Sequence, residues 1–251
     1  MAIKKKQKPV KPKPNYSGVL TKDDIIKRLE KPIKELRSLV ITPLPDGFDR
    51  DSIDLRLGSH FFVPRSYRSP CFIPGLTSPH HLYQEQYIPM GSFLVLPAHN
   101  TVLGGTLEYI KLPSDVSGEV LNKSSWARTF ITIETAPWIH PLFRGCLTLE
   151  IANVSNAPVI LYPGVKIAQL ILLSTTCDTS KKKKDEIEGT YIGPVRPEPA
   201  QLPYPEKALA PLGISKDEVT YPGDEYLNHE YFQTHVADML RVKGYTINKK
   251  P

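Results

Sequence analysis

Residues 39 to about 173 form a succession of short alternating segments separated by Pro, Gly and Asn, with no helical period between them. In SIDLRLG, alternation places Ile53, Leu55 and Leu57 on one face and polar side chains on the other. Such spacing is typical of a β-sandwich or barrel, so we expect an all-β domain. The further strand candidates are SFLVLP, TLEYIKLP, CLTLEIAN, APVILYPG and KIAQLILL.

Helical patterns are confined to the two ends of the chain. LTKDDIIKRLEKP predicts a short N-terminal helix, with Thr21 as N-cap, Asp24 in the capping-box position and Pro32 beyond its end. A stripe of apolar residues across 224–244 predicts an amphipathic C-terminal helix. The expected organisation is a disordered Lys/Pro tail (1–16), a barrel (17–175), an irregular proline-rich arm that is a candidate for closing a site (176–223), and a C-terminal helix and tail (224–251).

The composition fits a globular protein of the cytoplasm. Hydrophobic residues make up 40% and charged residues 23% of the 251 positions, which is ordinary for a soluble domain. No apolar run reaches the roughly 18 residues of a membrane span, and no apolar stretch follows the basic N-terminus as in a secretory signal. The three cysteines are far apart and form no CxxC pair, which favours a reducing compartment. We therefore expect a cytoplasmic protein without a membrane partner.

The net charge of +6 is local and does not indicate a specific nucleic-acid partner. Residues 1–14 hold six lysines and no acid, so the remainder is neutral overall. Such a tail cannot bury enough apolar surface to fold. A weak, salt-dependent contact with polyanions is the only nucleic-acid interaction that it suggests.

Glu150 is the first candidate for chemistry. In CLTLEIAN, alternation places it with Cys146 and Thr148 on the face opposite Leu147 and Leu149. One interpretation is a solvated charge on an outer sheet face, which is usual for a strand carboxylate. The other is a glutamate on a pocket wall that transfers protons near neutral pH.

NKSSWAR is the second candidate. Ser124 and Ser125 are flanked by Lys123 and Arg128, and such hydroxyls and cations can bind a phosphate, although serine-rich turns with basic neighbours are also common. The HxE and PCxxC signature of zinc deaminases is absent, and so are GxxxxGK[ST], GxGxxG and GxSxG. The sequence therefore predicts no zinc site.

In combination, the motifs are specific. SIDLRLG, IKLPSDVSGEVLNKSSWAR, TAPWIHPLFRGCLTLEIAN and LYPGVKIAQLIL resemble, in this order, the dCTP deaminase branch of the dUTPase-like superfamily. The resemblance spans residues 20 to 173. It implies a distorted β-barrel or jelly roll of the dUTPase-like type, a homotrimer with active sites between subunits, and nucleotides bound as Mg²⁺ complexes.

The resemblance also implies roles for the candidate residues. Glu150 matches the glutamate that takes a proton from water and passes it to the pyrimidine ring. Ser124 matches a serine that holds the water, and Arg128 an arginine that polarises this network. Lys123 and Ser125 match positions that contact the phosphates.

Further substrate-binding positions follow from the same motifs. Ala136 matches a loop residue whose backbone reads the cytosine edge. Thr148, on the strand face of Glu150, and Tyr191, in the closing segment, are also assigned to the substrate. His140 stands where the family usually has an aspartate, which activates water in dUTPases and holds the sugar in deaminases.

Two further departures concern the triphosphate. Lys123 replaces an arginine, which keeps the charge but loses bidentate geometry. Around Tyr191, Thr190 and Pro194 stand where a lysine and a glutamine are expected.

The expected function is deamination of a deoxycytidine nucleotide, dCTP, to dUTP and ammonia without a metal-bound hydroxide. One alternative is a catalytically impaired nucleotide-binding or assembly protein. Another is a dUTPase or bifunctional deaminase–diphosphatase, which the loss of the aspartate at His140 disfavours.

Overall fold

Strands dominate the structure, as the alternating segments predict. The computed structural model describes residues 18–45, 48, 50–65, 72–75, 77, 79–134, 136–175 and 193–219. The helices are α1 (Lys22–Leu29), α2 (Pro79–Leu82), α3 (Ser124–Ala127), α4 (Pro205–Leu209) and the 3₁₀ helices η3 (Ala210–Leu212) and η4 (Lys216–Glu218). The strands are β1 (Val40–Thr42), β2 (Ser52–Pro64), β3 (Tyr83–Tyr87), β4 (Leu94–Leu96), β5 (Thr101–Lys111), β6 (Val116–Asn122), β7 (Ile131–Ile133), β8 (Trp138–Ile139), β9 (Arg144–Asn153), β10 (Val159–Leu161) and β11 (Lys166–Ser174).

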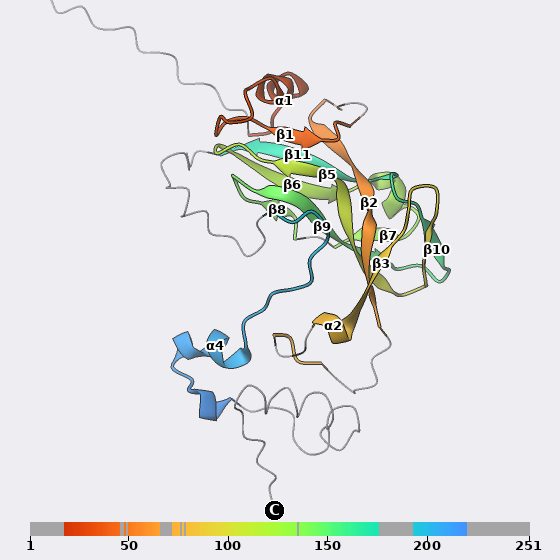
Figure 1. Cartoon of the computed structure of the whole chain (residues 1–251), viewed down its shortest axis with the longest axis vertical. Helices are drawn as coiled ribbons and strands as arrows, with labels where there is room; N and C mark the ends of the chain where they lie inside the picture. The colour runs from red at the N-terminus through yellow and green to blue at the C-terminus, as the bar shows by residue number, and fades with distance from the viewer. Residues whose placement is uncertain are drawn as a thin grey trace, which may run out of the picture.

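Nine of these strands form one curled antiparallel sheet (Figure 1). Its order is β7-β9-β5-β2-β11-β6-β8, with β1 paired to β5 and β3 paired to β2, while β4 and β10 form a separate pair. The prediction of an all-β, barrel-like domain is confirmed in the form of this curled half-barrel. The short N-terminal helix is also present, as α1.

A bend in β2 lets the sheet curl. β2 pairs with β11 before residue 57, and with β5 and β3 after it. A Cβ on Gly58 would lie 3.0 Å from the carbonyl oxygen of Gly105 and 3.1 Å from that of Thr106, so glycine permits this close approach. At the open side of the curl, Asn122 Nδ2 donates to the Ile131 carbonyl over 2.9 Å and joins β6 to β7.

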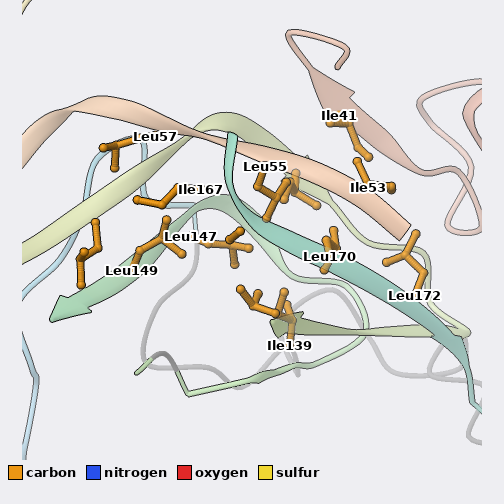
Figure 2. Packing of buried hydrophobic residues seen from close by; sticks show 14 of the residues in the cluster. Ile41, Ile53, Leu55, Leu57, Ile139, Leu147, Leu149, Ile167, Leu170 and Leu172 are labelled. Carbon is orange, nitrogen blue, oxygen red and sulfur yellow. The ribbon is translucent and has the colours of Figure 1, made fainter. Parts of the chain in front are cut away.

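The core lies inside the curl. The predicted face of SIDLRLG is confirmed, because Ile53, Leu55 and Leu57 are fully buried. Figure 2 shows side chains from β2, β9 and β11 gathered between the strands. This arrangement leaves Thr148 and Glu150 on the opposite face of β9. The residues labelled in Figure 2 are Ile41, Ile53, Leu55, Leu57, Ile139, Leu147, Leu149, Ile167, Leu170 and Leu172.

α1 is anchored to the barrel by one apolar and one ionic contact. Thr21 caps it as predicted, accepting from the Asp24 backbone N–H over 3.4 Å. Ile25 is fully buried. Arg28 forms a bidentate pair with Asp115, at 2.7 and 3.1 Å.

Two parts of the structure differ from the expectation. β6 was not among the predicted strands, yet residues 116–122 form a strand in which Ser117 is 1% exposed. The arm was expected to be irregular, but α4, η3 and η4 lie within its described part. The N-terminal tail, the lysine run at 181–184 and the predicted helix at 224–244 lie outside the described residues. Among the described helices, none is long and apolar enough to span a membrane.

Candidate active site

Glu150 lies on the outer face of β9, as the alternation predicts. Leu149 and Ile151 on either side of it are fully buried in the core, whereas Glu150 is half-buried on the opposite face. Its neighbour across the strand pair is Leu103, which in turn pairs with Phe62 on β2. The carboxylate therefore stands on a sheet surface with apolar neighbours and not inside the leucine core.

Tyr83 on β3 faces the same surface. Burial raises the pKa of its phenol above the ordinary value, and the negative charge of Glu150 raises it further. The Tyr83 ring contacts the Phe62 ring edge-on, with centroids 6.3 Å apart. Glu150 thus has a phenol within electrostatic range, and sequence reasoning had not identified it.

Residues 193–198, here called the covering segment, follow the edge of β9 at residues 193–194 and then cross onto the face of Thr148 and Glu150. The Cys146 N–H donates to the Pro194 carbonyl and the Gly193 N–H to the Arg144 carbonyl, each over 2.7 Å. Farther along, the Glu198 N–H donates to Thr148 Oγ1 over 3.0 Å. The hydroxyl of Thr148, predicted to bind substrate, is therefore engaged by the covering segment.

An ion pair fixes the covering segment to β3. Arg196 Nη1 lies 2.8 Å from Glu85 Oε1, and His60 Nδ1 lies 3.8 Å from the same oxygen. Because Tyr83 and Glu85 belong to one short strand, this ion pair ties the segment to the strand that carries the phenol near Glu150.

The second predicted cluster forms one helical turn at the end of β6. α3 begins directly after Lys123, and the side chains of Ser124, Ser125 and Arg128 are exposed. The indole Nε1 of Trp126 donates to the Lys166 carbonyl over 2.8 Å. This bond holds α3 against β11 and leaves both hydroxyls accessible.

A carboxylate accompanies the predicted phosphate-binding lysine. Asp54 Oδ1 accepts a short hydrogen bond from Lys123 Nζ, and Asp54 Oδ2 lies 3.4 Å from Lys166 Nζ. Burial alone would raise the pKa of Asp54, but the hydrogen bonds and charges of the two lysines outweigh it and hold that pKa below its ordinary value. Asp54 is therefore a charged member of this cluster.

Within one chain, α3 and Glu150 lie at opposite ends of β7. The Val154 N–H donates to the Phe130 carbonyl at the start of β7, next to α3. The Glu134 N–H donates to the Glu150 carbonyl at its other end. Residues 150 and 154 of an extended chain are about 13 Å apart. One chain thus separates the predicted water-holding serine from the predicted proton carrier.

The remaining predicted residues are dispersed. Ala136 and His140 are exposed on either side of β8, which pairs with β6. Tyr191 lies outside the described residues. Across the described residues, no three His, Cys, Asp or Glu side chains gather as protein ligands of a metal ion would.

Comparison of the sequence with known protein families identifies the family of this chain. A family model described as "dCTP deaminase-like" matches residues 19–175, which is more than half of the chain. The chain belongs to the dCTP deaminase-like family. The resemblance seen in the motifs is thereby confirmed, and the family is one of enzymes.

Individual relatives of this deaminase-like chain are similar over most of their length. The "dCTP deaminase, dUMP-forming" of Methanothermobacter thermautotrophicus is 33% identical over 191 residues, 74% of this chain and 94% of the relative. The "dCTP deaminase" of Haloarcula marismortui is 31% identical over 73% of this chain and 94% of the relative. A solved 2′-deoxycytidine 5′-triphosphate deaminase from Agrobacterium tumefaciens matches 62% of this chain and 48% of its own, with 22% identity and a TM-score of 0.49.

Three residues at or beside the candidate site of this deaminase-like chain, Asp54, Lys166 and Tyr83, were not identified from the sequence. Asp54 and Lys166 belong to strands that were predicted, but no local pattern joins them to Lys123. Tyr83 belongs to a segment that was not predicted as strand or site, whereas Arg196 lies in the arm that was predicted as a candidate for closing a site. Only the polar face of SIDLRLG, which contains Asp54, carried a usable signal.

Proposed function

We propose that this chain deaminates dCTP to dUTP and ammonia, with Glu150 as the group that moves the protons. The observation that carries the proposal is a half-buried glutamate on the outer face of β9, beside the covering segment, in a chain of the dCTP deaminase-like family. A carboxylate in such a partly desolvated position is suited to alternate between base and acid.

The chemistry requires two proton movements. Glu150 takes a proton from water, so that hydroxide attacks C4 of the cytosine, and the ring nitrogen N3 receives the proton. A second transfer from the attacking water to the exocyclic amine lets the C4–N bond break and ammonia leave, which forms the uracil carbonyl. Ser124 holds the water, and Arg128 keeps the serine–glutamate network polarised. The backbone at Ala136 reads the cytosine edge, while Thr148, Tyr191 and His140 belong to the substrate pocket.

We infer that two copies of the chain complete each site. The separation of α3 from Glu150 along β7 supports this, because Ser124 of one copy can then meet Glu150 of another. A homotrimer is the assembly that the resemblance implies, and closed cyclic symmetry gives equivalent sites. Mg²⁺ would arrive on the triphosphate, with its oxygens as ligands, since the described residues offer no cluster to hold the ion.

Release of dUMP and pyrophosphate is the second candidate. Relatives such as that of Methanothermobacter thermautotrophicus are named dUMP-forming, which favours it. His140 disfavours it, because a neutral imidazole lacks the carboxylate that the family's aspartate supplies for water activation. We therefore retain dUTP as the proposed product.

Separation of the nucleotides by chromatography after incubation with dCTP and Mg²⁺ tests both candidates. The wild type should release dUTP and ammonia, and Glu150→Gln should release neither above background. Glu119→Gln, which alters another half-buried strand glutamate, should behave as the wild type. Accumulation of dUMP with pyrophosphate would establish the second candidate instead. Unchanged dCTP with a folded wild type would refute both.

A further inference from the structure

Asp54 is shared by two lysines, and this arrangement bears on how the site meets its triphosphate. Each of its oxygens faces a different ammonium group, Lys123 on Oδ1 and Lys166 on Oδ2. The side chains of Asp54 and Lys123 are 13% and 19% exposed, whereas that of Lys166 is 43% exposed. The tighter pair is therefore the more buried one, and the looser lysine is the more accessible.

Charge balance assigns different parts to the two lysines. Lys123 Nζ donates a hydrogen bond to Asp54 Oδ1, and both side chains are largely buried, so the charge of Lys123 is largely matched by that carboxylate. Lys166 lies 3.4 Å away and adds a second positive charge, which leaves the group of three with a net charge of +1. The unmatched charge is the accessible one, and it is the charge that an anion approaching from solvent would meet.

The position of Lys166 is fixed relative to the serines. Its backbone carbonyl accepts the Trp126 indole N–H, and Trp126 lies in the same helical turn as Ser124 and Ser125. The backbone of β11 at Lys166 is thus held against the helical turn of the two exposed hydroxyls. The Lys166 ammonium lies 3.4 Å from Asp54, which also accepts from Lys123, the residue directly before Ser124. Phosphate binding commonly combines hydroxyl donors of this kind with a lysine that acts as a point charge.

We propose that Lys166 contacts the triphosphate of the nucleotide, and that the Asp54–Lys123 pair is its charge partner. This inference rests on the proposed function, because it takes a deoxycytidine triphosphate as the ligand. It changes the role of Lys123, which the motif had placed directly on the phosphates. In this chain the lysine at that position neutralises Asp54, so that Lys166 remains available.

Calorimetric titration of the full chain separates these roles. Glu150→Gln serves as the parent, so that turnover does not disturb binding of dCTP, dCMP and deoxycytidine. Lys166→Gln should weaken dCTP binding by roughly tenfold or more, weaken dCMP binding less and leave deoxycytidine unchanged. Lys166→Arg should retain dCTP binding. Lys27→Gln, which removes a lysine that is 71% exposed on α1, should have no effect.

A double substitution provides the sharper test. Lys123→Gln alone should weaken dCTP binding, because the unpaired Asp54 then draws Lys166 away from the ligand. Adding Asp54→Asn should restore the affinity to within about twofold of the parent, since Lys166 is released. If Lys123 itself binds the phosphates, the second change restores nothing, and the inference is overturned.

The remaining outcomes are also decisive. A parent that binds dCTP while Lys166→Gln binds it equally well overturns this inference and leaves the proposed function standing. A folded parent that binds none of the three compounds overturns the proposed function and the inference together. Urea unfolding of each variant shows whether a loss of binding is a loss of folding.

Discussion

Substitution of Gly145 by alanine tests whether the covering segment is seated on β9 as described. Gly145 has a φ of +142°, which side-chain-bearing residues rarely adopt. An added Cβ would lie 2.4 Å from Pro194 Cδ and 2.8 Å from its carbonyl oxygen. No rotamer relieves such a contact, because both atoms belong to a proline ring or the backbone. The alanine must therefore displace residues 193–194.

The loss of stability in Gly145→Ala has two sources, the unfavourable backbone conformation and the broken hydrogen bonds. The conformation itself costs about 1–3 kcal/mol in a residue other than glycine. Displacement also breaks the two hydrogen bonds between residues 144–146 and 193–194, each worth about 1 kcal/mol. Gly145→Ala should thus lower the free energy of unfolding by about 3–5 kcal/mol, or Tm by roughly 6–20 °C at this chain length.

Gly91→Ala is the matched control. Gly91 also has a positive φ, of +88°, but a Cβ there would meet nothing within 4 Å. It should lose only the conformational part, about 1–3 kcal/mol. Urea unfolding at equal protein concentration compares the two variants. Equal losses for Gly91→Ala and Gly145→Ala would refute the contact between Pro194 and β9.

Three other perturbations test the fold and its charges. Arg28→Met should cost about 3 kcal/mol in urea unfolding, because Asp115, 7% exposed, loses its bidentate partner; an unchanged midpoint would contradict this. Asn153→Ala should cost about 2–3 kcal/mol, since this amide donates to three carbonyls; a loss below 0.5 kcal/mol would count against that network. Asp54 has a lowered pKa, so its ion pairs stabilise the fold fully above about pH 4 and progressively less as pH falls through the folded pKa. The difference in the free energy of unfolding between wild type and Asp54→Asn should therefore shrink in acid. A constant difference from pH 7 to pH 2 would contradict this.

Local patterns predicted the parts of the fold where one face of a strand is apolar. β2 and β9 were found because leucines and isoleucines alternate with polar residues, and the same alternation placed Glu150 outside the core. β6 was not found because Ser117 and Gly118 have the composition of a turn. They are buried within the sheet, where β6 pairs with β11 along one edge and with β8 along the other. This pairing is a tertiary effect and not a local one.

The candidate site shows the same limit more strongly. Glu150, Ser124 and Arg128 were identified by a motif, whose spacing is local. The pairing of Asp54 with Lys166 joins residues 112 positions apart and depends on the register of β2 with β11. The residues around Asp54 and those around Lys166 do not predict this register when either segment is considered alone. The contact of residues 193–198 with β9 likewise depends on Gly145, because a Cβ there would collide with Pro194, which is distant in sequence.

A subunit-mixing experiment tests most directly that Glu150 and Ser124 of different copies perform dCTP deamination together. Ser124→Ala and Glu150→Gln are each assayed alone and after co-expression in equal amounts, with ammonia release from dCTP as the readout. Each variant alone should be inactive. The mixture should recover about one quarter of wild-type activity, since a random trimer pairs an intact serine with an intact glutamate at that fraction of its sites. A mixed, correctly assembled protein that stays as inactive as its two components would contradict the shared site.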